Sequence, residues 1–176
     1  MSVLRQIRAI ALLPGMVLLV IPAFLIHATG SVNPGWALPS PWSAATIGAG
    51  VLLVGMGLSL MVRTIGLLNS VGRGTLAPWD PTRRLVVRGP YRRVRNPMIS
   101  GVMCVLLGEA VLLGSLALLE WFACFVILNM TFIPLAEEPD LLRRFGEDYR
   151  FYRKNVPRWI PRRTPWRPPW ENAPEI

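Results

Sequence analysis

The stretch that decides the fold reads PMISGVMCVLLGEAVLLGSLALLEWFACFVILNMTFIPLA and runs from Pro97 to Ala136. It contains no Lys or Arg. As one helix it would be about 60 Å long, twice the thickness of the hydrocarbon core of a bilayer. The stretch must therefore cross twice, and Gly114-Ser115 near its middle is the natural turn. The sequence predicts a tight helical hairpin made of two membrane spans.

Two more apolar runs precede the hairpin. The first extends from about Ala9 to Ile26, and the second from about Ala44 to Val62. Each is roughly 20 residues long, which is enough to cross the hydrocarbon core. Hydrophobic residues make up 52% of the 176-residue chain, and its mean hydropathy is +0.42, a high value for a soluble domain. We therefore expect an all-α, polytopic membrane protein of about four transmembrane helices.

Basic residues orient these spans. The net charge is +9. Arginines precede the first span, fill the segment before the hairpin and crowd the tail, whereas the loop after the first span and the Gly114 turn have none. Because Lys and Arg gather on the cytoplasmic side, we expect both termini there. Charge that alternates with long apolar runs argues against nucleic acid as a partner. Lys154 is the only lysine, a bias that indicates a bacterial inner membrane.

After the hairpin the chain becomes polar. Five residues recur at helical spacing and form the apolar face of a cytoplasmic helix: Leu141, Leu142, Phe145, Tyr149 and Tyr152. Such a helix lies on the membrane or packs under the bundle. Closely spaced prolines then end regular structure, and the tryptophans among them suit the membrane interface. We divide the chain into two N-terminal spans (1–68), a core (69–163) and a Pro/Trp-rich tail (164–176).

Two polar clusters should meet at the cytoplasmic mouth of the hairpin. Arg95-Asn96-Pro97 opens the third span, and Glu137-Glu138 closes the fourth at the same face. An arginine binds a carboxylate, and a glutamate binds an ammonium or ribose hydroxyls, so the two clusters suit a zwitterionic ligand. The alternative is a plain interfacial charge pair that anchors the helix ends.

Several short motifs occur in order along residues 72–163. They are Gly89-Pro90-Tyr91, Arg95-Asn96-Pro97, Gly101, Glu137-Glu138, Phe145-Gly146-Glu147-Asp148-Tyr149 with Tyr152, and Val156-Pro157-Arg158-Trp159-Ile160-Pro161. In this order and spacing they resemble the isoprenylcysteine carboxyl methyltransferase family and the related phospholipid N-methyltransferases. The family pattern reads Arg-His-Pro-x-Tyr-x-Gly, followed by Glu-Glu. Here Asn96 stands in place of the histidine and Ile99 in place of the tyrosine.

The resemblance implies an enzyme that wraps S-adenosylmethionine at the cytoplasmic membrane face, with Arg95 and Glu138 as catalytic residues. The residues that it implies for cofactor binding are Tyr91, Arg95, Asn96, Pro97, Gly101, Glu137, Glu138, Tyr149 and Tyr152. Methyl transfer from a sulfonium is an in-line displacement, so a carboxylate acceptor needs only positioning. A phospholipid amine or a thiol needs Glu137 or Glu138 as a proton acceptor. The expected partners are a lipophilic or lipid acceptor and membrane lipids.

Two other functions stay open on the sequence. Membrane sterol reductases resemble the same core but bind NADPH, and this chain is short for that function. The second alternative is a membrane protein without catalysis, given the replacements at Asn96 and Ile99. Cofactor binding separates the three possibilities.

Four more residues inside the hairpin carry reactive groups. Glu109 and Glu120 each stand five residues from the turn on their own arm, so they share a depth near the outer face. Intramembrane carboxylates either serve a function, such as sharing a proton, or make hydrogen-bonded contacts near the interface, and we favour the contacts. Cys104 and Cys124 lie in apolar runs and read as small hydrophobes. We expect no metal site.

Overall fold

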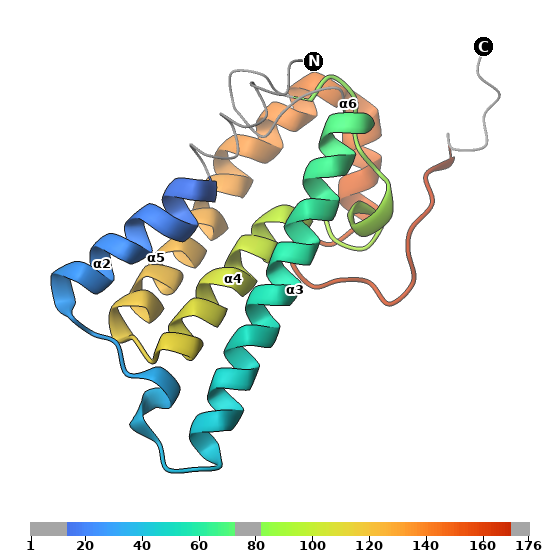
Figure 1. Cartoon of the computed structure of the whole chain (residues 1–176). Coiled ribbons are helices and arrows are strands. Elements are labelled where there is room, and N and C mark those ends of the chain that lie inside the picture. Colours follow the sequence, from blue (N-terminus) through green and yellow to red (C-terminus); the bar gives the residue numbers. More distant parts are fainter. Residues whose placement is uncertain (1–13, 73–81, 170–176) are drawn as a thin grey trace.

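The computed structural model describes residues 14–72 and 82–169, and every regular element within them is helical (Figure 1). This confirms the all-α prediction. In chain order the elements are η1 (Met16–Val20), α2 (Ile21–Thr29), η2 (Pro34–Ala37), α3 (Trp42–Ser70), η3 (Gly89–Arg92), α4 (Pro97–Leu113), α5 (Leu116–Phe132), η4 (Ile133–Glu137) and α6 (Glu138–Asn155).

The first apolar run forms a helix that extends further than predicted. Its expected start at Ala9 lies outside the described residues. The helix passes through the π-helical turn η1 and ends at Thr29, so the expected end at Ile26 is wrong. Gly30 stops it, because this residue adopts a left-handed conformation (φ 60°) and donates its N–H to the Ile26 carbonyl.

Helix α3 is longer than the second predicted span. It runs to Ser70, eight residues past the expected end at Val62, and Arg63 lies within it. A charge ends the part of a helix that lipid covers, but it does not break the helix. Thr64 stays fully buried in this extension because its hydroxyl donates to the Met61 carbonyl at 2.9 Å. The end of α3 therefore extends beyond the uncharged part of the helix and is packed against the segment before α4.

The hairpin turn lies where the sequence predicts it. Helix α4 ends at Leu113, α5 begins at Leu116, and Gly114 between them has φ 56°. A Cβ atom at Gly114 would collide with the carbonyl oxygen of Asn33, whose N–H donates to the Leu113 carbonyl at 2.8 Å. Glycine is required here both by the left-handed backbone and by the close approach of the loop before α3.

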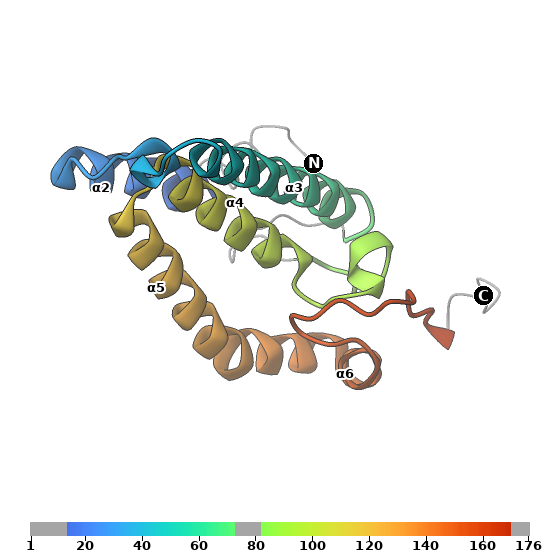
Figure 2. The same ribbon diagram turned by 90° about the horizontal axis from the view of Figure 1, so that it is seen from below.

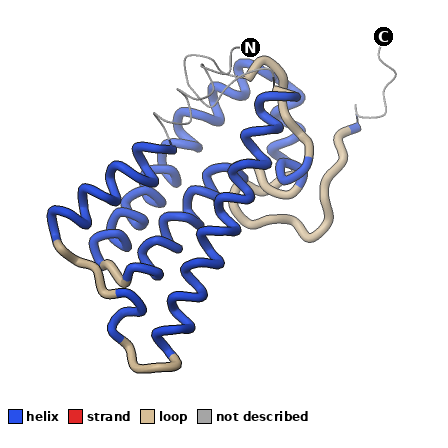
Figure 3. Tube along the Cα trace, in the orientation of Figure 1, coloured by secondary structure: helices blue, strands red, loops and turns tan. Residues whose placement is uncertain are grey.

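Three stretches of the described chain are long and apolar enough to cross a membrane: Met16–Ala37, Trp42–Ser70 and Leu116–Asn155. The last of these includes the charged helix α6. Helix α4 is apolar but shorter, about 26 Å at 1.5 Å per residue. A fourth crossing, by α4, stays a prediction. Figure 3 shows that α4 lies alongside the longer helix α3 over the whole length of α4.

Glycines let α3 and α4 pack backbone against backbone. A Cβ atom added to Gly57 would lie 2.6 Å from the carbonyl oxygen of Gly101, and one added to Gly101 would lie 2.9 Å from that of Gly57. Gly50 makes a similarly close contact with α4, two turns away. Small residues bring helices together in lipid, where no hydrophobic force drives helix association. The Gly57–Gly101 contact therefore sets the height of α4 beside α3.

Helix α6 consists of two helical segments. Gly146 within it has φ 55° and ψ −128°, far from helical values. Figure 2 shows the last part of α6 end-on, across the direction of the part before it. The bend places Tyr149 and Tyr152, each 2% exposed, in a cluster with Val87 and Val156. Leu141, Leu142 and Phe145 pack against the same cluster, so the five apolar residues share a core, although one straight helix does not carry them.

We predict that Gly57→Ala lowers the unfolding free energy of the detergent-solubilised protein by about 1–3 kcal/mol, because the new methyl group forces α3 and α4 apart. The matched control is Gly55→Ala, since nothing lies within 4 Å of a Cβ atom at that position. The control should be neutral or slightly stabilising. Equal loss of stability in both variants, measured by thermal unfolding, would contradict the packing role.

Candidate functional site

A buried ion pair joins the segment before α4 to the start of α6. Arg95 donates from Nη1 to Oε1 of Glu138 at 2.6 Å, and the two side chains are only 9% and 5% exposed. The same nitrogen lies 3.4 Å from the Tyr149 hydroxyl. Leaving one partner of such a pair alone is strongly destabilising, because a charge is then buried without compensation. The structure thus brings together residues from opposite ends of the predicted hairpin.

Arg158 is a third member of this cluster. Its Nε donates to Oε1 of Glu138 at 2.7 Å and its Nη2 to Oε2 at 2.9 Å, a two-pronged arrangement that suits the planar guanidinium. Arg153 lies 3.9 Å from Oε2. Both carboxylate oxygens of Glu138 are therefore engaged. The sequence motif from Val156 to Pro161 contains Arg158, but its spacing does not show which carboxylate an arginine reaches.

The tail follows the segment before α4 as a strap. Three backbone N–H groups donate hydrogen bonds between these two segments: Arg95 to the Pro157 carbonyl, Arg162 to the Arg93 carbonyl and Trp166 to the Arg92 carbonyl, each at 2.9 Å. The Trp166 ring also packs on Tyr152, with ring centroids 6.0 Å apart. The part of the Pro/Trp-rich tail that the structure describes is thus docked on the core, and it holds the backbone N–H of Arg95.

Three tyrosines line the same region. Tyr152 donates its hydroxyl to the Tyr91 carbonyl at 2.7 Å. The rings of Tyr149 and Tyr152 lie 6.2 Å apart. Burial, and then the charge of Glu137, raises the pKa of Tyr91 well above its ordinary value, so this phenol stays neutral and lies close to Glu137. All three residues are among those expected to contact the cofactor.

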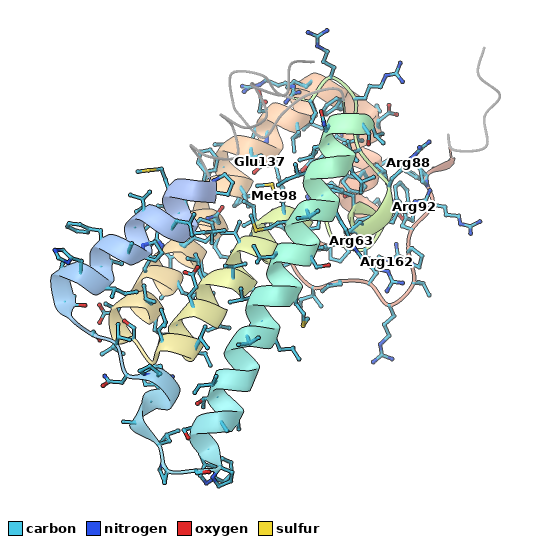
Figure 4. The ribbon with its side chains drawn as sticks, viewed as in Figure 1. Arg63, Arg88, Arg92, Met98, Glu137 and Arg162 are labelled. Atoms are coloured by element: carbon cyan, nitrogen blue, oxygen red, sulfur yellow. The ribbon has the colours of Figure 1, made fainter. Side chains whose placement is uncertain are left out.

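Glu137 lies beside the arginine cluster but is not part of it. It ends the π-helical turn η4 that connects α5 to α6. Its side chain forms no hydrogen bond or ion pair with residues 14–72 or 82–169. It acts on neighbouring groups only through its charge. Figure 4 labels Glu137 on η4 and Met98 near the start of α4. Two consecutive carboxylates thus differ sharply: arginines neutralise Glu138, and none of them contacts Glu137.

A family model described as phospholipid methyltransferase matches residues 45–148. The chain belongs to the phospholipid methyltransferase family. The match extends from α3 into α6, so it contains both Arg95 and Glu138. No curated protein and no solved structure matches the chain. Membership confirms the resemblance seen in the sequence and assigns the chain to a family of membrane methyltransferases.

Other expected cofactor residues in the family-matched segment occupy different places. Asn96 precedes α4, and its side chain makes no capping hydrogen bond to the helix. Pro97 is fully buried in the first turn. Gly101 lies one turn further, and its close contact is with Gly57 and Met61 of α3.

In the described chain the two carboxylates inside the hairpin, Glu109 and Glu120, do not pair with each other. Glu120 is exposed on α5. Oε2 of Glu109 is buried and has no hydrogen-bond partner in the described part of the chain. The expected hydrogen-bonded contacts are therefore not seen for this atom, and the phospholipid methyltransferase match gives it no role.

We predict that Arg158 and Glu138 are energetically coupled. In a double-mutant cycle with Arg158→Gln and Glu138→Gln, the coupling in unfolding free energy should be about 1–3 kcal/mol, the range for hydrogen bonds to charged groups. The control cycle uses Arg150→Gln and Glu147→Gln, a pair whose side chains are 63% and 80% exposed. Coupling there should stay below about 0.5 kcal/mol. Similar coupling in both cycles would refute the special role of Glu138.

Proposed function

We propose that the chain transfers a methyl group from S-adenosylmethionine to a lipophilic acceptor at the cytoplasmic face of a membrane, with both termini on that side. One observation carries the proposal. Within the family-matched segment, the buried charges of Arg95 and Glu138 meet at the mouth of the helical hairpin. Buried charges are costly, and their concentration in one place is typical of functional sites.

The residues present fit the amino-acid end of S-adenosylmethionine. Arg95, Arg153 and Arg158 surround the single carboxylate of Glu138, so the cluster keeps surplus positive charge. Nε of Arg95 is buried without a hydrogen-bond partner in the described residues. A ligand carboxylate would satisfy these donors, and Glu137 would accept hydrogen bonds from a ligand ammonium. The bound cofactor supplies a methyl group on a positively charged sulfur.

The arrangement suggests separate tasks for the two expected catalytic residues. We place Arg95 against the ligand carboxylate, in direct contact. Both oxygens of Glu138 are engaged by arginines, so we assign it to holding Arg95 in position. Glu137 then serves as the proton acceptor when the methyl acceptor is an amine or a thiol. An isoprenylcysteine-type carboxylate needs no such base.

The acceptor is proposed to reach the site sideways from the bilayer. Helix α5 and the turn after it expose large apolar side chains, among them Ile127, Leu128, Phe132 and Leu135. Lipid covers such surfaces in a membrane protein. The cofactor is polar and charged, so it arrives from the cytoplasm, near the charged segment of α6. A phospholipid-like acceptor suits this division between an apolar route and a polar one.

Cofactor binding tests the proposal. Purified protein in detergent should bind S-adenosylmethionine or S-adenosylhomocysteine in titration calorimetry and should not bind NADPH. Arg95→Ala should weaken binding by tens to thousands of fold, because a buried charged hydrogen bond of this kind contributes about 2–5 kcal/mol. The exposed neighbour Arg93 gives the control Arg93→Ala, which should bind normally. NADPH binding would favour a reductase, and binding of neither ligand would favour a protein without catalysis.

The route of the acceptor has its own test. Labelled methyl transfer to a hydrophobic acceptor should exceed transfer to a truncated, water-soluble version of the same acceptor, because only the hydrophobic form concentrates in the bilayer. The comparison uses protein reconstituted in vesicles and expresses both rates as kcat/KM. Equal efficiency for the two versions would mean that the acceptor enters from the cytoplasm and would overturn sideways access.

A further inference from the structure

Arginines from three separate segments gather on one side of the molecule. Figure 4 shows them together: Arg63 from α3, Arg88 and Arg92 from the loop around η3, and Arg162 from the tail. We call these four residues the arginine patch. Arg63 and Arg88 are exposed, and the other two are partly buried. The methyl-transfer proposal gives this patch no task.

Packing fixes the three segments relative to one another. A Cβ atom at Gly89 would lie 3.0 Å from Cδ1 of Leu67, so η3 rests on the last turns of α3. Leu67 lies four residues after Arg63, and residues four apart share a helix face. The tail joins them because the N–H of Arg162 donates to the Arg93 carbonyl at 2.9 Å. The patch is therefore built by the fold and does not result from one basic stretch of sequence.

Three arginines of the patch differ from the arginines of α6 in their surroundings. On α6, Arg143 and Arg144 pair with Asp140, and Arg150 pairs with Glu147. In the described chain no ion pair involves Arg63, Arg88 or Arg162. The side-chain bond from Arg162 goes to a neutral carbonyl, that of Asn155, at 2.6 Å. No carboxylate of the described chain therefore neutralises Arg63, Arg88 or Arg162, whereas carboxylates neutralise the arginines of α6.

The patch also lies at a defined depth. Residues 42–62 of α3 contain no charged side chain, and at 1.5 Å per residue they are about 30 Å long, the thickness of the hydrocarbon core. Arg63 is the next residue, so it lies where lipid headgroups begin. Tail residue Arg162 and loop residue Arg88 are held beside the same end of α3. A phosphate at headgroup level is thus within the zone that all three segments occupy.

We propose that the arginine patch binds the headgroup of an anionic phospholipid from the surrounding bilayer. Guanidinium groups match phosphate oxygens in geometry and charge. Each basic residue near an anionic membrane surface strengthens binding by about fivefold. The patch shares no residue with the cluster of Arg95, Glu138, Arg153 and Arg158. It holds a structural lipid, which stabilises the contact between α3, the η3 loop and the tail.

The test titrates short-chain phosphatidylglycerol into the purified full chain in detergent and counts bound lipid by native mass spectrometry, with short-chain phosphatidylcholine as the neutral probe. We expect saturable binding of phosphatidylglycerol only. The variant Arg63→Gln/Arg162→Gln should weaken it by about 25-fold. The control Arg143→Gln/Arg150→Gln removes the same charge from the paired side and should bind within twofold of the wild type.

Three outcomes overturn the proposal. The patch variant binds phosphatidylglycerol as well as the wild type; the control variant loses binding to the same extent, which would mean a general effect of net charge; or phosphatidylcholine binds equally well. Thermal unfolding of each variant without lipid shows whether it is folded. Because S-adenosylhomocysteine affinity is measured in the same samples, failure of the lipid site is distinguished from failure of the methyltransferase proposal.

Discussion

The carboxylate of Glu138 is the constraint that holds together the polar half of the molecule. It is only 5% exposed, and a charge at such a depth requires partners. Those partners come from three parts of the chain: Arg95 before α4, Arg153 late in α6 and Arg158 in the tail. Satisfying one buried charge therefore draws the loop, the bent helix and the tail onto each other. The same cluster leaves positive charge in surplus, and a ligand carboxylate is its natural complement.

The apolar half follows a different rule, and the two halves meet at the start of α4. Lipid removes the hydrophobic force between helices, so close backbone contact at Gly57 and Gly101 takes its place. That contact fixes the height of α4 beside α3 and thus the height of Arg95, which immediately precedes the helix. The main charged group of the site is thus positioned by a packing contact between two glycines, in which no polar side chain takes part.

Physical reasons explain which features of this structure could be predicted from the sequence and which could not. A run without Lys or Arg that is twice as long as the bilayer is thick forces a hairpin. Its ends must then meet, so Arg95 and Glu138 were predictable as neighbours. The continuation of α3 past Arg63 was not, because charge marks the edge of lipid and not the end of a helix. The bend at Gly146 was not predictable either, because the apolar residues keep their helical spacing on both sides of it. The role of Arg158 arises only when the tail folds back, since local spacing does not encode which carboxylate a distant arginine meets.

The most direct measurement is an experimental structure of the chain in complex with S-adenosylhomocysteine. We predict that the carboxylate of this ligand contacts Arg95, that its ammonium contacts Glu137, and that Glu138 still bridges Arg95 and Arg158. Ligand bound elsewhere on the chain would contradict the site. Release of Glu138 from Arg158 to hold the ligand itself would contradict the division of tasks between the two carboxylates.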